Sequence, residues 1–224
     1  RIGIVDYGMG NRRSVQKAFE RVGAQVVVSR DGDELNACDG LVVPGVGSFP
    51  LAMRNLRELG LADVIRSWAG DGAPLLGICL GMQVLFDFSE ELETTDGLGL
   101  LAGEVTPLDG GGLRVPHIGW NEVRFERPSA LTAGLPAAGC PFYHVHSLAP
   151  RTRDPADVVG TTEYGDRFAT IVERDNVFGV QFHPEKSSGH GLRLLANFVE
   201  LCRDRADTGR GPAADAALAA RSRG

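Results

Sequence analysis

The sequence predicts an α/β fold in which a mostly parallel, doubly wound sheet is flanked by helices. Short apolar, β-branched runs alternate with amphipathic segments of helical period, as in chains that build parallel sheets. The 224 residues, 43% hydrophobic and 23% charged, match the size and composition of one globular domain. Glycine-rich turns follow several apolar runs, at the strand ends where open α/β sheets place their sites.

The first strand is predicted at Ile2–Val5, where an apolar run ends at the turn-like stretch DYGMGN. A helix follows and ends at Gly23. Its apolar residues recur with helical spacing: Val15, Ala18, Phe19 and Val22. The second strand is predicted at Ala24–Ser29, because this run is short and rich in valine.

The third strand lies in GLVVPGVGSF and runs into a glycine-rich turn. Two helices are expected next, at Phe49–Leu59 and Leu61–Ala69. The stretch APLLGI is predicted to be a fourth buried strand. The stretch that follows it, CLGMQVLFDFSEEL, is predicted to be a helix.

The middle of the chain, from Gly97 to Phe168, has a different residue pattern. Glycine, proline and short alternating stretches such as NEVRFERP and DVVGTTEY predict antiparallel strands added to one edge or face of the sheet. A buried strand returns at Val177–Phe182, and GLRLLANFVELCR is the closing helix. We expect one domain over residues 1–203 and a disordered tail over 204–224, which has no large apolar face.

Composition excludes several classes of function. The net charge is −6 and the basic residues are scattered, which argues against a nucleic-acid partner. No apolar run approaches the roughly 20 residues of a membrane span, and the N-terminal stretch does not resemble a signal peptide. The four cysteines form no C-x-x-C pair, so we expect free thiols, no metal site and a cytoplasmic location.

The stretch Gly77-Ile78-Cys79-Leu80-Gly81 has the form of a nucleophile elbow with cysteine in place of serine. An elbow is a tight strand-to-helix turn, and its glycines avoid clashes where the chain nearly touches itself. A helix N-terminus also favours the thiolate. The alternative is a buried structural cysteine, the usual role of this residue.

A thiol nucleophile needs a base, and the base needs an orienting partner. His183 alone among the five histidines leaves a predicted buried strand with a carboxylate, Glu185, two residues later. In an extended backbone these two side chains point to the same side, and Pro184 favours extension before it. Cys79, His183 and Glu185 are therefore the candidate triad, the alternative for His183 being a surface His-Pro turn.

Attack on an amide carbonyl creates an oxyanion that requires preorganised N–H donors. The start of the elbow helix offers the N–H of Leu80. The turn Pro44–Gly47 offers a second donor from Val46, unless it is a plain strand-to-helix loop. No G-x-G-x-x-G follows the first strand, which argues against a dinucleotide site.

Taken together, these motifs resemble a known family. GICLGMQ with HPEKS resembles the triad class of glutamine amidotransferases. With DYGMGN, PGVGSF, VPHIGWN, FYHVHS and GVQFHPEKS, the chain is similar to the glutaminase subunit of imidazole glycerol phosphate synthase. The match runs in order from Ile2 to about Cys202, and the tail has no counterpart in the pattern.

The resemblance implies a role for each site residue. Cys79 attacks the carboxamide carbon of glutamine, His183 shuttles protons, and Glu185 orients His183. Donors around the oxyanion come from Leu80 and from the turn Gly45, Val46 and Gly47. The bound glutamine is held by Gln83 and Ser147. No cofactor and no metal is implied.

The resemblance also implies a partner. Ammonia passes through a channel to a (β/α)₈ cyclase subunit of a heterodimer, which converts the ribulosyl intermediate PRFAR into imidazole glycerol phosphate and AICAR in histidine biosynthesis. The HIGWN stretch lies at the subunit contact, with Trp120 as an anchor or, alternatively, as a core aromatic. His144 and His146 are expected to be structural.

Two other classes of function use the same residues. A stand-alone cysteine hydrolase, such as a γ-glutamyl peptidase, has the same triad and no partner. A non-catalytic binding module keeps the fold alone, and the intact triad argues against it.

Overall fold

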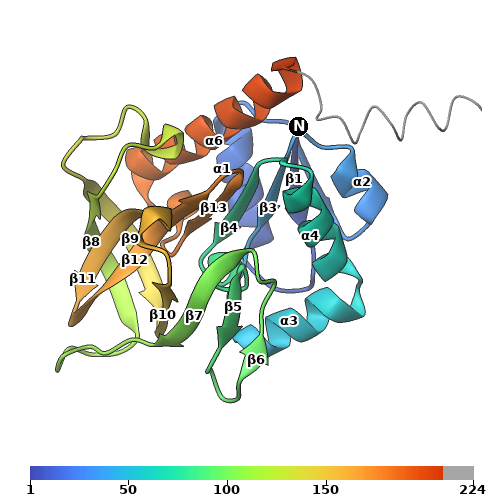
Figure 1. Cartoon of the computed structure of the whole chain (residues 1–224). Helices are drawn as coiled ribbons and strands as arrows, with labels where there is room; N and C mark the ends of the chain where they lie inside the picture. The colour runs from blue at the N-terminus through green and yellow to red at the C-terminus, as the bar shows by residue number, and fades with distance from the viewer. Residues whose placement is uncertain (209–224) are drawn as a thin grey trace, which may run out of the picture.

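The computed structural model describes residues 1–208, which form two sheets covered by helices (Figure 1). The larger sheet has nine strands in the order β2-β1-β3-β4-β13-β12-β11-β8-β9. Its first five strands are parallel: β2 (Val26–Ser29), β1 (Ile2–Val5), β3 (Gly40–Val43), β4 (Leu75–Ile78) and β13 (Val177–Val180). All but β2 are buried along their whole length, as expected for strands covered on both faces.

The predicted antiparallel region fills two places. Four strands extend the large sheet beyond β13: β12 (Asp166–Arg174), β11 (Val158–Tyr164), β8 (His117–Phe125) and β9 (Cys140–His146). The other strands of this region, β10 (Leu148–Thr152) and β7 (Leu101–Pro107), form a smaller sheet with β5 (Phe86–Ser89) and β6 (Thr95–Asp96), which precede the region. In this sheet β5 runs parallel to β7, which was not predicted. The predicted fold class is confirmed.

Helices cover both faces of the parallel half. Apolar residues of α1 (Arg12–Arg21) and α6 (Ser188–Thr208) pack into one core cluster, which contains Phe19 and Phe198. The opposite cluster contains residues of α2 (Gly32–Asn36), α3 (Phe49–Glu58) and α4 (Leu61–Gly70). The smaller sheet lies on the side of α3 (Figure 1). Three short 3₁₀ turns complete the description: Ala130–Thr132, Pro155–Asp157 and Pro184–Lys186.

One predicted element is wrong. The stretch from Cys79 to Leu92 is not one helix, because α5 covers only Leu80–Gln83 and the chain then enters β5. The carbonyls that would continue the helix accept from other segments. Val84 O accepts from Leu98 N at 2.8 Å, and Leu85 O accepts from Leu100 N at 2.8 Å. Tertiary hydrogen bonds therefore end the helix after one turn.

Smaller differences concern element boundaries. Helix α2 was not predicted, although Asp31 caps it by accepting from the N–H groups of Asp33 and Glu34. Helix α6 continues to Thr208, past the expected boundary at residue 203. Residues 209–224 of the predicted tail lie outside the described residues. Within residues 1–208, no helix is long and apolar enough to cross a membrane.

Candidate active site

Cys79 lies in the tight turn that joins β4 to α5. Strand β4 is near the middle of the large sheet. Its backbone has φ 56° and ψ −114°, a left-handed conformation that is unfavourable for a residue with a side chain. A Cβ added to Gly81 would collide with the carbonyl oxygen of Val43, and one added to Gly77 would lie 2.5 Å from Gly81 O. The two glycines are therefore required by close packing, as the elbow motif predicts.

The sulfur of Cys79 is enclosed by polar groups from two other segments. Cys79 is only 6% exposed. Its Sγ lies 3.8 Å from the carbonyl oxygen of Val145 on β9 and 3.8 Å from Nε2 of Gln181, which follows β13. The backbone N–H of Cys79 donates to Val180 O at 2.8 Å, so β13 holds the turn directly.

His183 and Glu185 form a buried pair beside this sulfur. Nδ1 of His183 lies 2.9 Å from Oε1 of Glu185, and their side chains are 4% and 1% exposed. The contact forms across the 3₁₀ turn that begins at Pro184, so the extended geometry assumed from the sequence holds for His183 alone. Burial acts to lower the pKa of His183, but hydrogen bonds with Cys79 and Glu185 outweigh it and raise that pKa to about 10.

The other three cysteines have a different environment. Cys38, Cys140 and Cys202 are buried and free of disulfides. Burial raises the pKa of Cys38, that of Cys140 to about 11 and that of Cys202 to about 12. These thiols remain neutral near pH 7 and are poor nucleophiles.

The predicted oxyanion turn, Pro44–Gly47, packs directly against the elbow. A Cβ on Gly45 would lie 2.6 Å from the hydroxyl of Tyr7 and 2.8 Å from Cβ of Leu80. The hydroxyl of Tyr7 donates to Pro44 O at 2.6 Å and fixes the start of the turn. Val46 is 43% exposed and Gly47 has φ +110°. The structure thus brings Gly45 and Leu80 together and leaves Val46 at the surface.

Gln83 and Ser147 differ in their surroundings. Gln83 is buried, and its Nε2 donates to Leu148 O at 3.2 Å and to Oε1 of Gln181 at 3.1 Å. Both hydrogens of its amide are therefore used within the protein. Ser147 is exposed and joins β9 to β10, and its carbonyl accepts from Leu108 N at 2.9 Å.

Three histidines of β8 and β9 form a buried cluster: His117, His144 and His146. His117 Nδ1 lies 3.1 Å from His146 Nε2, and the rings of His117 and His144 stack with centroids 4.8 Å apart. Burial lowers the pKa of His117 and of His146 to about 4, and the pKa of His144 lies well below its usual value for the same reason. The cluster is therefore neutral near pH 7, and the structural role of His144 and His146 stays a prediction.

Trp120 lies at the surface of β8 and is not a core aromatic. Its side chain is 53% exposed and meets the ring of Tyr143 edge-on at 6.1 Å between centroids. The ammonium of Lys186 lies 5.9 Å from the centroid of the Tyr143 ring. Ile118, two residues before Trp120 on the same strand, is 60% exposed. Together they leave a partly apolar surface on β8.

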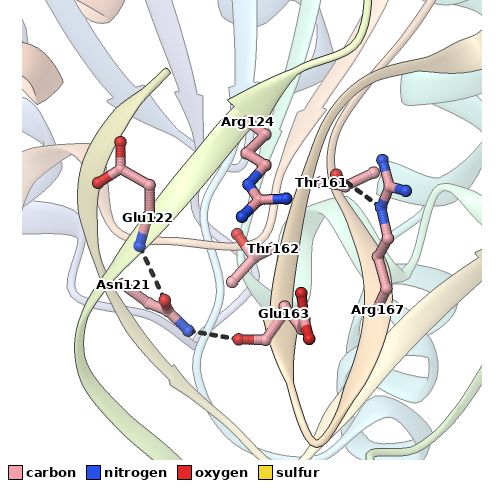
Figure 2. A pocket seen from close by; sticks show the side chains of 7 residues that line it. All are labelled: Asn121, Glu122, Arg124, Thr161, Thr162, Glu163 and Arg167. Atoms are coloured by element: carbon pink, nitrogen blue, oxygen red, sulfur yellow. Dashed lines mark hydrogen bonds between the residues drawn. The ribbon is translucent and has the colours of Figure 1, made fainter. Parts of the chain in front are cut away.

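A polar pocket of about 110 Å³ lies on β8, β11 and β12. Its lining mixes both signs of charge, with Glu122 and Glu163 beside Arg124 and Arg167 (Figure 2). Asn121 closes one side by donating to Glu163 O at 2.9 Å. The balanced charge favours neither an anionic nor a cationic ligand. Within residues 1–208, no cluster of three or more histidine, cysteine or acidic side chains is placed to hold a metal ion.

Two residues that contact this site were not predicted: Tyr7, which holds the oxyanion turn, and Gln181, which lies beside the sulfur. Gln181 gave a usable signal, because a polar side chain in the otherwise apolar run VFGVQF must find buried partners. Tyr7 gave none, since its partner Pro44 comes from a distant segment.

Comparison with known proteins agrees with this geometry. The family model of class-I glutamine amidotransferases matches residues 3–202. The imidazole glycerol phosphate synthase subunit HisH of Moorella thermoacetica is 54% identical over 208 residues, covering 93% of this chain and 98% of the relative. The same subunit of Geobacillus thermodenitrificans is 50% identical over 205 residues, covering 89% and 95%.

Solved structures agree in fold. A crystallised glutamine amidotransferase superimposes with a TM-score of 0.71 at 23% identity and covers 90% of this chain and 98% of its own. PurLQS from Thermotoga maritima gives a TM-score of 0.70 at 21% identity, covering 90% of this chain and 98% of the chain compared. At these identities the likeness concerns the fold alone.

Proposed function

This chain belongs to the class-I glutamine amidotransferases, among the HisH subunits of imidazole glycerol phosphate synthase, and we propose that Cys79, His183 and Glu185 are its catalytic triad. The chain hydrolyses glutamine to glutamate and ammonia for histidine biosynthesis. The observation that carries the triad is the buried chain of contacts from Cys79 through His183 to Glu185. It joins the only cysteine in an elbow to the one histidine that is held by a carboxylate among the described residues.

The chemistry follows from the charges of these groups. The thiolate of Cys79 attacks the carboxamide carbon, an S–C bond forms, and the carbonyl becomes an oxyanion. As the oxyanion collapses, the C–N bond breaks and the imidazolium of His183 gives its proton to the leaving ammonia. Water then attacks the thioester, giving a proton to His183, and glutamate leaves as the S–C electron pair returns to sulfur. The raised pKa of His183 favours the imidazolium that the first step requires.

Stabilisation of the oxyanion is assigned to the N–H groups of Leu80 and Val46. Leu80 is the first residue of α5, where N–H groups have no acceptor within the helix. Gly45 packs against Leu80, which places the turn beside the elbow. Gly47, with φ +110°, ends the turn that carries the Val46 N–H.

Binding of the substrate glutamine is assigned to Gln83 and Ser147. Because the amide hydrogens of Gln83 are both used by Leu148 O and Gln181, its carbonyl oxygen is the atom left to accept from the substrate. Ser147 is exposed at the junction of β9 and β10, next to Leu148. No cofactor takes part in this scheme.

The partner is assigned as the (β/α)₈ cyclase subunit, with which the chain forms a heterodimer in the cytoplasm. Its relatives are named as subunits of a synthase, and a subunit requires a contact surface. Trp120 and Ile118 provide exposed apolar area on β8, and a buried aromatic anchor is typical of protein interfaces. Ammonia released at Cys79 passes from there to the cyclase, which uses it on PRFAR.

The function is tested by mixing the chain with the cyclase subunit, PRFAR and glutamine labelled with ¹⁵N in the amide. Label in imidazole glycerol phosphate supports the proposal. Glutamate formation without labelled product, and no complex on gel filtration, would favour a stand-alone hydrolase. Absence of any glutamate, in a mixture where free ammonia still supports the cyclase, would favour a binding module.

A further inference from the structure

Gln181 is a fully buried carboxamide that no step above uses. It follows β13, two residues before His183, and its backbone N–H donates to Thr170 O at 2.9 Å. Its side chain reaches the catalytic sulfur, with Nε2 at 3.8 Å from Sγ of Cys79. A buried amide requires partners for both its oxygen and its nitrogen, so its orientation is set by its neighbours.

The neighbours of Gln181 determine which end of its amide faces sulfur. Leu148 O only accepts, so the group that points to it from Gln83, at 3.2 Å, must be the NH₂. The second hydrogen of that NH₂ goes to Gln181 at 3.1 Å, which requires the oxygen of Gln181 on that side. The NH₂ of Gln181 therefore faces Sγ.

A second set of hydrogen bonds supports the same polarity. Leu148 O also accepts from Nδ1 of His146 at 2.8 Å, which leaves Nε2 of His146 as an acceptor for Nδ1 of His117. Nε2 of His117 then accepts from Asn121, whose nitrogen is fixed by its bond to Glu163 O (Figure 2). Each ring has one tautomer that satisfies its partners, so Leu148 O is held in place as the acceptor for Gln83.

The sulfur of Cys79 needs a donor on the side where Gln181 lies. Val145 O, at 3.8 Å, is an acceptor and suits the neutral thiol, whose S–H points to it. When the thiol ionises, the same carbonyl oxygen faces a negative charge. N–H donors to the thiolate offset this repulsion, since hydrogen bonds to charged groups are the strong ones.

We propose that Gln181 is a catalytic residue whose side-chain NH₂ donates to Sγ of Cys79 and stabilises the thiolate that attacks glutamine. The same donor serves the sulfur again when the thioester is hydrolysed and the S–C electron pair returns to Cys79. The inference rests on the proposed role of Cys79 as nucleophile. It assigns the thiolate two neighbours that donate to it, the imidazolium of His183 and the neutral amide of Gln181.

The test compares two variants in the complex with the cyclase subunit. Gln181→Met keeps the size of the side chain and removes the donor, and Gln181→Glu replaces the donor with a carboxylate oxygen. The rate at which iodoacetamide alkylates Cys79 is measured from pH 5 to 10 by mass spectrometry of the Cys79 peptide. We expect the alkylation profile of Gln181→Met to move about one pH unit or more towards alkaline pH. The alkylation profile of Gln181→Glu should shift further in the same direction. In both variants kcat should fall, with a smaller change in KM.

Asn197→Leu is the matched control. Asn197, on α6, is another buried carboxamide, and it donates to Leu131 O in the 3₁₀ turn Ala130–Thr132 and to Ala133 O just after it, not to Cys79. Its loss should lower the melting temperature and leave the alkylation profile unchanged. If Gln181→Met loses stability like Asn197→Leu and keeps the wild-type alkylation profile, Gln181 is structural and the inference is overturned.

A measurement on the unaltered side chain covers the case in which the variants do not fold. The side-chain amide signals of Gln181, followed by NMR, should shift over the pH range in which Cys79 becomes reactive, and should stop doing so in Cys79→Ala. Amide signals of Gln181 whose chemical shifts stay constant over this pH range would refute the inference. Failure of the proposed function is a separate result, because glutaminase activity that survives alkylation of Cys79 would exclude Cys79 itself.

Discussion

Nδ1 of His183 lies 2.9 Å from Oε1 of Glu185, and this carboxylate is almost completely enclosed. Its other oxygen, Oε2, is buried without a hydrogen-bond partner among the described residues. Among the described residues, the carboxylate of Glu185 therefore has one hydrogen-bond partner, the proposed acid–base residue His183. Its effect is to hold the ring and to stabilise the imidazolium.

Replacing Glu185 with Gln should slow glutamine hydrolysis and leave Cys79 alkylatable by a glutamine-like affinity label. We expect kcat to fall by about 10²-fold or more, within the range of about 10²–10⁴ that a positioned acid–base group contributes. The pKa of His183 should fall as well, because the carboxylate helps to raise it. Glu126→Gln, at the surface of the chain, is the control. Complete loss of labelling at Cys79 would show that Glu185 has a larger role.

Cys79→Ala should abolish glutaminase activity and preserve the fold. In the native chain, iodoacetamide at pH 7 should modify Cys79 first, because burial raises the pKa of Cys38, Cys140 and Cys202 and keeps them neutral. Peptide mass spectrometry identifies the modified residue, and circular dichroism checks the fold. Full activity in Cys79→Ala would refute the assignment.

The oxyanion turn is predicted to be incomplete until the partner binds. Gly47 has φ +110°, so Gly47→Ala should strain the turn that carries the Val46 N–H and reduce the activation by the cyclase and PRFAR. A lost oxyanion donor costs about 10²–10³-fold in turnover, which sets the scale of that activation. Turnover is compared for the chain alone, with the cyclase, and with the cyclase and PRFAR. Equal rates in all three conditions would exclude gating by the partner.

Gly45→Ala is a contrasting variant, for a reason that the sequence does not reveal. Its Cβ would lie 2.6 Å from the hydroxyl of Tyr7 and 2.9 Å from Gly81 N, so it would push the turn away from the elbow. We expect Gly45→Ala to destabilise the fold, as seen by thermal unfolding. In the sequence, Gly45 and Gly47 looked equivalent, and the structure gives them different constraints.

Acid should destabilise the chain through its histidine cluster. The pKa of His117 and of His146 falls from 6.5 to about 4 on burial, so below pH 6.5 the unfolded chain binds protons that the folded chain does not. The free energy of unfolding should therefore decrease from about pH 6.5 down to about pH 4, by up to about 1.4 kcal/mol for each pKa unit and group. Urea unfolding at several pH values measures the slope. His117→Gln should flatten it, while His190→Gln, outside the cluster, should not.

Much of the fold is predictable because the buried strands are continuous apolar runs. Ile2–Val5 and Leu75–Ile78 are buried along their whole length, and the sequence shows this directly. The segment after Gln83 was not predictable, because its apolar residues fit a helix as well as a strand. Its state is decided by carbonyl bonds to residues 98–101, which no local pattern encodes.

The candidate site, like the fold, is only partly predictable from the sequence. The elbow glycines and the pair His183 and Glu185 have local signatures, since spacing along one strand end brings them together. The contacts of Gln181 and Tyr7 join segments that are far apart in the chain, so only the fold places them. Trp120 was ambiguous because an aromatic residue in an alternating strand suits a core and a surface equally. Its exposure of 53% decides the matter.

The position of β4 between β3 and β13 has a consequence for the growing chain. Cys79 leaves the ribosome while Gln181, 102 positions later, has not yet been translated. At about 5–20 residues per second, that interval lasts about 5–20 s. Throughout that interval the position that β13 takes beside β4 is empty, and neither His183 nor Gln181, the proposed activators of the sulfur, is present. We therefore expect a nascent chain to carry its thiol without consuming glutamine, and activity to begin only when almost the whole protein has been synthesised.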